Sequence, residues 1–230
     1  MSDGTYHNPN AKPNYHKMLQ EIIEIVKTQY DHKPSLLLHA CCAPCSSYCI
    51  ELLSQVFQIT IYYYNPNIHP QSEYERRLNE LKKFLTQFPQ AVQDNVKLVQ
   101  AEYNIEDFFQ ATNVRNEPEL QTEAERGERC RRCYNLRMSK AWDYASLNGF
   151  EFFTTTLSIS PHKDSMMINE IGFNLPLSVK TKYLPADFKK NSGYLRSTQL
   201  SKEYGLWRQD YCGCVYSKQN MANSKSVPIN

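Results

Sequence analysis

Apolar and polar positions follow two different periods along the chain. In residues 14–30, apolar side chains recur every three or four positions, which predicts an amphipathic helix. Residues 36–38 are three consecutive leucines after Pro34, and a short apolar run of this kind indicates a buried strand. The same criteria predict further helices at residues 46–53, 70–88 and 131–147, and further strands at residues 57–64, 96–99 and 152–157. Residues 119–127 are interpreted as a polar connection.

The order of these elements predicts the architecture. Strand, loop and helix alternate along the chain, which favours right-handed βαβ units and an α/β fold with a mostly parallel sheet covered by helices on both faces. The length of 230 residues suits one domain, at residues 14–218, between polar tails at 1–13 and 219–230. Ligands of such sheets bind beyond the carboxyl ends of the strands, so we expect the functional loops at that edge.

The sequence shows no secretion signal and no membrane-spanning segment. Its first residues include an acidic side chain, and no run approaches the ~18 apolar residues that a spanning helix needs. We therefore expect a soluble, cytoplasmic protein without a membrane partner. In that compartment thiols stay reduced, so clustered cysteines favour metal binding or catalysis over structural disulfides.

Cysteine carries most of the chemical information in this chain. Seven of the eight cysteines fall into three clusters, Cys41-Cys42-x-x-Cys45, Cys130-x-x-Cys133 and Cys212-x-Cys214. Soft metals, iron–sulfur clusters and redox dithiols require grouped thiols of this kind. The eighth, Cys49, stands among apolar residues of a predicted helix, and we interpret it as a core residue.

The first cluster follows the strand at 36–38, where a nucleotide-binding protein would have a glycine-rich loop. Residues 39–46 contain no glycine, so thiols stand in place of a phosphate cradle. Adjacent residues at a strand end point in roughly opposite directions. Cys41 and Cys42 therefore need not ligate the same atom, and this arrangement would allow them to bridge two centres.

The other two clusters admit more than one chemistry. Cys130 and Cys133 share one face of a first helical turn, and such a pair fits a redox motif, half of a zinc site or two ligands of an iron–sulfur cluster. Gly213 allows a sharp turn between Cys212 and Cys214, which suits a strained disulfide or a second metal. Seven thiols exceed the needs of one tetrahedral ion.

Overall charge says little about partners. The net charge of +2 and the pI near 8.0 lie below the range that indicates a nucleic-acid-binding protein from composition alone. Locally, arginines crowd the second cysteine pair and lysines precede the third. These local charges fit a solvated basic face as well as a contact with nucleic acid.

Four runs of residues, taken together, are specific enough to indicate a family. The runs are LHACCAPCS at 38–46, GERCRRCYNLR at 127–137, FTTTLSISP at 153–161 and GLWRQDYCGCVYS at 205–217. In this order, within residues 15–218, they resemble the epoxyqueuosine reductases of the QueH type. The resemblance implies a Rossmann-like fold of the HUP class, a [4Fe-4S] cluster, and the last step of queuosine synthesis at the wobble position of tRNA.

The resemblance also implies roles for the cysteines. Carried over by motif, the cluster ligands are Cys41, Cys42, Cys130 and Cys133. Some members have an aspartate where this chain has Cys45, which implies an additional iron ion held by Cys45, Cys212 and Cys214 with one of the vicinal pair. Cys212 and Cys214 also resemble a redox-active pair, so a metal-ligand role and a disulfide role both stay open for them.

The implied reaction requires further groups. Removing an epoxide oxygen to leave an alkene takes two electrons and two protons, whereas an iron–sulfur cluster passes one electron at a time. We therefore expect a second redox or metal centre, an electron donor that the sequence does not identify, and an acid. The predicted catalytic residues are Cys45, Cys212, Cys214 and Asp187. Tyr194 and His39 are further candidate acids, although each also suits a structural hydrogen bond.

The implied substrate lies in an anticodon loop, whose phosphates attract basic side chains. The candidates for phosphate contacts are Arg76, Arg77, Arg131, Arg132, Lys189, Lys190, Arg196 and Arg208. Tyr62, Tyr63 and Tyr64 are predicted to pack within a strand rather than to stack on bases.

Two functions of other classes stay open at this stage. An iron-free cytosolic thiol-disulfide reductase would use the CxxC pair without a metal, and a zinc-stabilised RNA-binding module would hold zinc and lack reductase activity. Metal analysis separates both from an iron–sulfur enzyme.

Overall fold

A computed structural model of the chain describes residues 12–225. The strands are β1 (Ser35–His39), β2 (Gln58–Tyr63), β3 (Lys97–Gln100), β4 (Phe152–Thr155) and β5 (Lys182–Tyr183). The helices are α1 (Tyr15–Gln29), α2 (Ala43–Leu53), α3 (Gln71–Gln87), α4 (Pro89–Gln93), α5 (Ile105–Thr112), α6 (Glu119–Thr122), α7 (Glu128–Leu147), α8 (Ser165–Phe173), α9 (Gly193–Glu203) and α10 (Val215–Lys225), with the 3-10 helix η1 at Thr156–Ile159.

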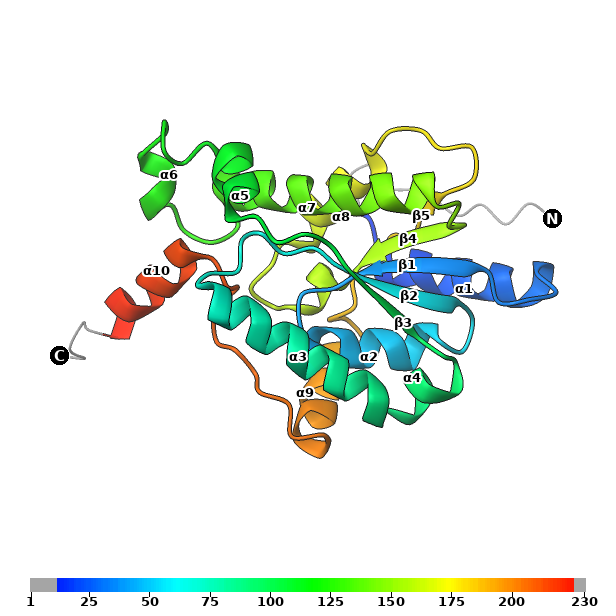
Figure 1. The fold of residues 1–230 in the computed structure, drawn as a ribbon. Coiled ribbons are helices and arrows are strands. Elements are labelled where there is room, and N and C mark those ends of the chain that lie inside the picture. The colour runs from blue at the N-terminus through cyan, green and yellow to red at the C-terminus, as the bar shows by residue number, and fades with distance from the viewer. Residues whose placement is uncertain (1–11, 226–230) are drawn as a thin grey trace.

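The five strands form one parallel sheet in the order β3-β2-β1-β4-β5, with helices on both faces (Figure 1). This confirms the predicted α/β fold class, and the strand order is that of a Rossmann-like sheet. The chain leaves β1 toward β2 on one side and returns at β4 on the other. The loops after β1 and β4 therefore diverge at the carboxyl edge, which is where ligands of such sheets bind.

The two faces of the sheet bury alternate residues of each strand. In β1, Leu36 and Leu38 belong to a core that includes residues of α1, α2 and α3, whereas Leu37 belongs to a core with residues of α7 and α8. All three leucines are fully buried, and burial of one such side chain contributes about 1.5–3 kcal/mol. Because β1 is covered on both faces, its sequence is apolar without alternation.

The structure confirms most of the predicted elements and corrects their ends. The helix predicted at 131–147 begins at Glu128, because the Glu123 carboxylate accepts hydrogen bonds from the amides of Glu128 and Arg129. The strand predicted at 152–157 ends at Thr155, where η1 begins. The polar connection at 119–127 contains α6, and no prediction covered α4, α5, α8, α9, α10 or β5.

Two packing predictions are confirmed. Cys49 lies on α2 and is fully buried in the apolar core. The side chains of Tyr62, Tyr63 and Tyr64 are also buried, as expected for residues that pack within a strand. Residues 1–11 and 226–230 of the predicted polar tails lie outside the described residues. The predicted end of the domain, residue 218, lies inside α10. Between residues 12 and 225, no helix combines the length and apolar character needed to cross a membrane.

Candidate metal centre

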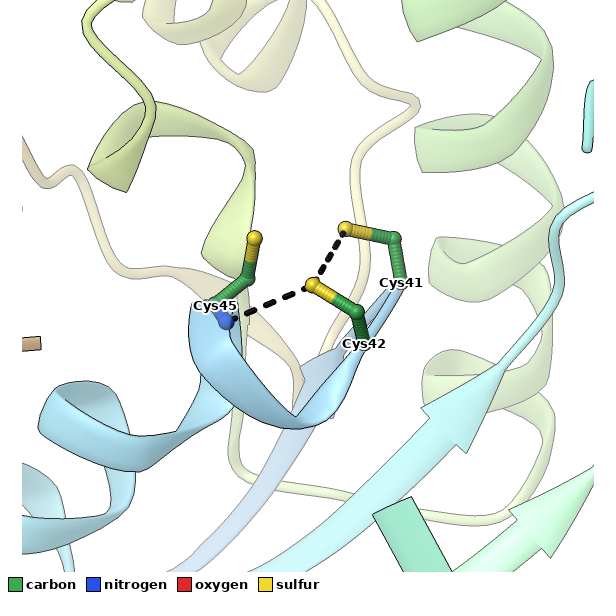
Figure 2. Close-up of side chains that lie close together, drawn as sticks. All are labelled: Cys41, Cys42 and Cys45. Atoms are coloured by element: carbon green, nitrogen blue, oxygen red, sulfur yellow. Dashed lines mark hydrogen bonds between the residues drawn. The ribbon is translucent and has the colours of Figure 1, made fainter. Parts of the chain in front are cut away.

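The first cysteine cluster lies at the turn from β1 into α2 (Figure 2). The Sγ atoms of Cys41, Cys42 and Cys45 all lie within 4.8 Å of one another, and those of Cys41 and Cys42 are 3.7 Å apart. The expectation that Cys41 and Cys42 point in opposite directions is therefore wrong. Both residues follow the end of β1 at His39, and the chain bends there into the helix instead of continuing the strand pleat.

A backbone contact holds this turn in place. The Cys42 thiol caps α2 by accepting a hydrogen bond from the amide of Cys45 at 3.3 Å. Pro44 stands in the first turn, where its missing amide costs no hydrogen bond. The three thiols are thus presented by the amino end of a helix, and their spacing allows them to ligate a common metal ion.

The second cluster lies in the first turn of α7. Cys130 and Cys133 are both buried, and the Glu123 carboxylate occupies the amino end of the helix just before them. Gly127 makes this approach possible, because a Cβ atom there would lie 2.2 Å from the carboxyl carbon of Glu123. A side chain at position 127 would displace the Glu123 carboxylate from this cap.

The third cluster lies on the loop between α9 and α10. The Sγ atoms of Cys212 and Cys214 are 3.5 Å apart, and both residues are free thiols. Gly213 has φ +113°, and a Cβ atom there would lie 3.0 Å from Nη1 of Arg77. Arg77 Nη1 also donates to the Cys212 carbonyl at 3.1 Å, and the His69 amide donates to the Gly213 carbonyl at 2.9 Å. These contacts attach the loop to α3 and to the loop after β2.

Two neighbouring cavities bring the three clusters together. The smaller, of about 20 Å³, is lined by Cys130, Cys133, Cys212 and Cys214. The larger, of about 480 Å³, is lined by Cys41, Cys45 and Cys212. Cys212, Lys163 and Glu125 line both cavities, so all seven clustered thiols belong to one composite site. How these thiols divide between a cluster and a second metal stays a prediction.

Positive charge is buried around the thiols. Arg77, Arg129 and Arg137 are each at most 2% exposed, and Lys163 is 8% exposed. Of these four cations, Arg77 forms an ion pair, with Glu73 at 2.7 Å. Within residues 12–225, Nη2 of Arg77 and Nε of Arg129 and Arg137 have no hydrogen-bond partner. Such buried charge is costly unless an anion offsets it.

This excess of positive charge fits a thiolate-ligated metal. Seven thiols provide soft ligands, and a metal site built from several thiolates carries a net negative charge. Arg137 also connects two clusters, because it donates to Asn65 Oδ1 at 2.6 Å while Asn65 Nδ2 donates to the Ala40 carbonyl at 2.9 Å. The residues present therefore fit an iron–sulfur cluster or a related thiolate-bound metal.

The thiols differ in their tendency to ionise. Hydrogen bonds with Cys42 and Cys45, followed by the charges of Lys163 and Arg137, lower the pKa of Cys41 below its ordinary value. The hydrogen bond with Cys214 lowers the pKa of Cys212 to about 6. Burial raises the pKa of Cys133 to about 12. One thiol of the first cluster and one of the third thus favour the thiolate, the form that binds metal.

The predicted acids occupy different positions. Asp187 pairs with Lys189 at 2.8 Å and accepts a hydrogen bond from Ser165 at 2.9 Å, and it does not line either cavity. His39 is fully buried between Thr155 and the Tyr64 carbonyl, and burial lowers its pKa to about 3. Tyr194 lines the larger cavity. These contacts suit structural roles for Asp187 and His39, and a catalytic role of Asp187 stays a prediction.

The candidate phosphate contacts also differ in their surroundings. Arg77 needs correction, because its guanidinium is buried against Glu73 and the Cys212 carbonyl and does not face solvent. Ion pairs with acidic neighbours engage Arg131, Arg132, Lys189 and Arg196, whereas Lys190 is exposed. Arg76 stacks 3.6 Å from the Trp207 ring centre, and Arg208 lies 5.2 Å from that of Tyr194.

Sequence reasoning did not identify Lys163, Glu125 or Arg137 as site residues. Lys163 follows the run at 153–161, Glu125 lies in the segment interpreted as a polar connection, and Arg137 ends the run at 127–137. The proximity of each residue to a recognised motif is a signal that it belongs to the site. A charged side chain, however, is ordinarily expected at the surface. Their burial depends on contacts between distant segments.

Comparison with known proteins identifies the family of this chain. The profile of the family described as Epoxyqueuosine reductase QueH matches residues 36–220. Proteins with that name are similar to this chain in Streptococcus pyogenes serotype M1 (42% identical over 210 residues, 91% of this chain and 80% of the relative) and Staphylococcus epidermidis (40% over 208 residues, 90% and 86%). Another, from Thermotoga maritima, is 35% identical over 187 residues, which cover 80% of this chain and 90% of the relative. The chain therefore belongs to the epoxyqueuosine reductase QueH family.

Proposed function

We propose that the protein reduces epoxyqueuosine to queuosine at the wobble position of tRNA, in the cytoplasm. The observation that carries the proposal is that thiols from all three motifs meet at two adjoining cavities at the carboxyl edge of the sheet. Six of the seven thiols line these cavities, and the seventh, Cys42, lies beside Cys41. The relatives that match most of the chain are named for this reaction. A family that contains epoxyqueuosine reductases is a family of oxidoreductases, which argues against a purely structural zinc module.

The cofactor in this proposal is a [4Fe-4S] cluster with an additional iron ion. Cys41, Cys42, Cys130 and Cys133 would hold the cluster, and Cys45, Cys212 and Cys214 would hold the second iron or act as a redox pair. These metals would supply electrons one at a time and a Lewis acid for the substrate oxygen. The electron donor is a separate partner of the enzyme.

The protein groups around the larger cavity would bind and shield the modified base. A cavity of about 480 Å³ has the size of a small-molecule site. Tyr194 and Arg208 line it and form a cation–π pair, and aromatic and guanidinium planes of this kind stack on unpaired bases. Pro44 and Ile159 contribute apolar surface that would exclude water from the thiols.

Basic side chains at several positions of the chain would contact the tRNA backbone. Arg76, Arg131, Arg132, Lys189, Lys190, Arg196 and Arg208 remain the proposed phosphate contacts. Exposed ion pairs are worth only about 0–1 kcal/mol, so a phosphate can replace the carboxylate partner of such a residue at little cost. Binding of tRNA should weaken as salt concentration rises, because each phosphate contact releases counterions.

The test combines metal analysis with turnover. Protein purified without oxygen should contain about four or five irons with acid-labile sulfide, and should convert epoxyqueuosine in an anticodon stem-loop RNA to queuosine with a chemical reductant. Nucleoside mass spectrometry measures the loss of one oxygen. Stoichiometric zinc without sulfide would contradict the proposal, and activity in an iron-free, colourless protein would favour the thiol-disulfide alternative.

A further inference from the structure

A buried lysine stands where the two cavities of the site meet. Lys163 lies in the loop after η1, and its side chain lines the larger and the smaller cavity together with Cys212. It is 8% exposed, and its charge interacts with the thiols of Cys41, Cys45 and Cys212, but within residues 12–225 its ammonium group has no hydrogen bond and no carboxylate partner. A buried, unpartnered ammonium is costly because burial removes its hydration. This position therefore indicates a ligand atom with negative or partial negative charge.

The position of Lys163 in the fold places it opposite the first cysteine cluster. β1 and β4 are neighbours in the sheet, and the segments that follow them carry Cys41 and Lys163. These segments diverge at the point where ligands of such sheets bind. The larger cavity is also lined by the exposed residues His162 and Asp210, so it opens to solvent. A molecule that enters there meets the ammonium group and the thiols together.

The other buried cations of the site have protein partners. Arg77 pairs with Glu73, Arg129 donates to main-chain carbonyls such as that of Glu123, and Arg137 donates to Asn65. Through those contacts, the three arginines hold the loops and α7 in place. Lys163 differs because it lines both cavities, and within residues 12–225 its ammonium group donates no hydrogen bond to a protein acceptor.

We propose that Lys163 donates a hydrogen bond to the epoxide oxygen of the substrate and stabilises the negative charge that develops on it. This inference rests on the proposed function. In the reaction both carbon–oxygen bonds of the epoxide break and a carbon–carbon double bond forms. Two electrons come from a low-potential one-electron donor, and the oxygen leaves as water with two protons from solvent. A cation that is already in place binds this oxygen more strongly in the transition state than in the ground state.

The experiment uses the metal-loaded enzyme, an anticodon stem-loop RNA that carries epoxyqueuosine, and the Lys163→Ala variant. Loss of the donor should lower kcat about a hundredfold or more and change KM by less than about threefold. Added ethylammonium, which has N–H donors and fits the space of the missing side chain, should raise the rate of the variant about tenfold. Tetramethylammonium has the charge but no N–H group, and it should restore nothing.

The matched control is Lys27→Ala, which removes an exposed lysine of α1 that pairs with Glu24. Its kcat, its iron and sulfide content and its response to both ammonium ions should equal those of the wild type. The iron and sulfide content of Lys163→Ala should also stay at the wild-type level, because the proposed contact is with the substrate.

Three results would overturn the inference. Lys163→Ala could turn over as fast as the wild type, or the two ammonium ions could rescue it equally, which would reduce the role to charge alone. Loss of iron from the variant would assign the lysine to the metal centre instead. A wild-type enzyme that holds iron and leaves epoxyqueuosine unchanged would overturn the proposed function itself, which distinguishes that failure from the other three.

Discussion

The layers on the two faces of the sheet and the carboxyl edge of the same sheet are built from different chemistry. In the layers, leucine, isoleucine and phenylalanine side chains fill the cores, as Leu37 and Phe153 do between β1, β4 and α7. At the edge, thiols, three buried arginines and Lys163 share a site with two cavities. The layers follow the ordinary rules of a stable core, whereas the edge violates them.

This difference indicates where stability and function lie. Burial of apolar area stabilises the layers without any ligand. Buried guanidinium nitrogens without partners destabilise the edge until an anionic group offsets their charge. Departures from good packing and satisfied polar groups concentrate at functional sites. A bound anionic group should therefore stabilise the edge, and substitutions in the two regions should have different consequences.

The largest contrast should come from cysteines, one in each region. Cys130→Ala removes a thiol that lines the small cavity, and we expect loss of the brown colour, of labile sulfide and of detectable turnover. Cys49→Ala is the matched control, because Cys49 is also buried but lies on α2 within the apolar core and lines neither cavity. It should keep iron and activity and destabilise by only about 1 kcal/mol. Equal loss of iron in both variants would contradict a division between the regions.

Next in size is the truncation of a core side chain. Leu37→Ala leaves a cavity between β1 and α7, and the free energy of unfolding should fall by about 2–5 kcal/mol. Iron content per folded molecule and turnover should change little. Urea unfolding under anaerobic conditions measures the loss, with the exposed Leu147→Ala as control, which should stay within about 0.5 kcal/mol of the wild type.

A smaller effect, on the free energy of unfolding, should have opposite signs in the metal-free and the metal-loaded protein. Arg137→Met removes a buried charge beside Cys133, so unfolding of the metal-free protein should show a neutral effect or a gain of about 1–2 kcal/mol. In the metal-loaded protein the same change should destabilise by about 1–3 kcal/mol, because the anionic centre loses its counter-charge. Arg115→Met, at an exposed pair with Glu106, should have little effect in either state. Destabilisation of both forms to the same extent would show that Arg137 acts by packing alone.

The smallest effect should come from the surface. Lys190→Ala removes one exposed charge that we propose contacts a phosphate, so the slope of log affinity for tRNA against log salt should decrease by about one. Fluorescence anisotropy at several salt concentrations measures this slope. Lys27→Ala serves as the control and should leave it unchanged. An unaltered slope in Lys190→Ala would remove that residue from the tRNA contacts.

Residues of the layers were predictable because their signal is local. The recurrence of apolar positions in 14–30 and the leucine run 36–38 report which face of a helix or strand is buried, and this pattern requires no knowledge of the partner. Short elements such as β5 and α6 carry too few residues for a period to be recognised. The beginning of α7 also escaped prediction, because its cap is a carboxylate five residues upstream.

Residues of the edge were predictable only as members of motifs. Spacing identified every clustered cysteine, and it indicated the class of cofactor that they suit. It did not indicate that Cys41 and Cys42 lie side by side, that Arg77 is buried under the Cys212 carbonyl, or that Lys163 is enclosed between the cavities. A charged residue in a sequence is expected at the surface, and the burial of Arg77 and of Lys163 contradicts that expectation.

The sequence by itself determined the fold class, the number and grouping of the thiols and the family to which they belong, because each of these depends on local period or on spacing within a motif. The tertiary structure decided which thiols face each other and which cations face the thiols. Those neighbours come from the segments after β1 and β4, from α3 and α7, and from the segment before α10. Their meeting depends on the strand order of the sheet, which joins segments that are distant in sequence and that no local period relates.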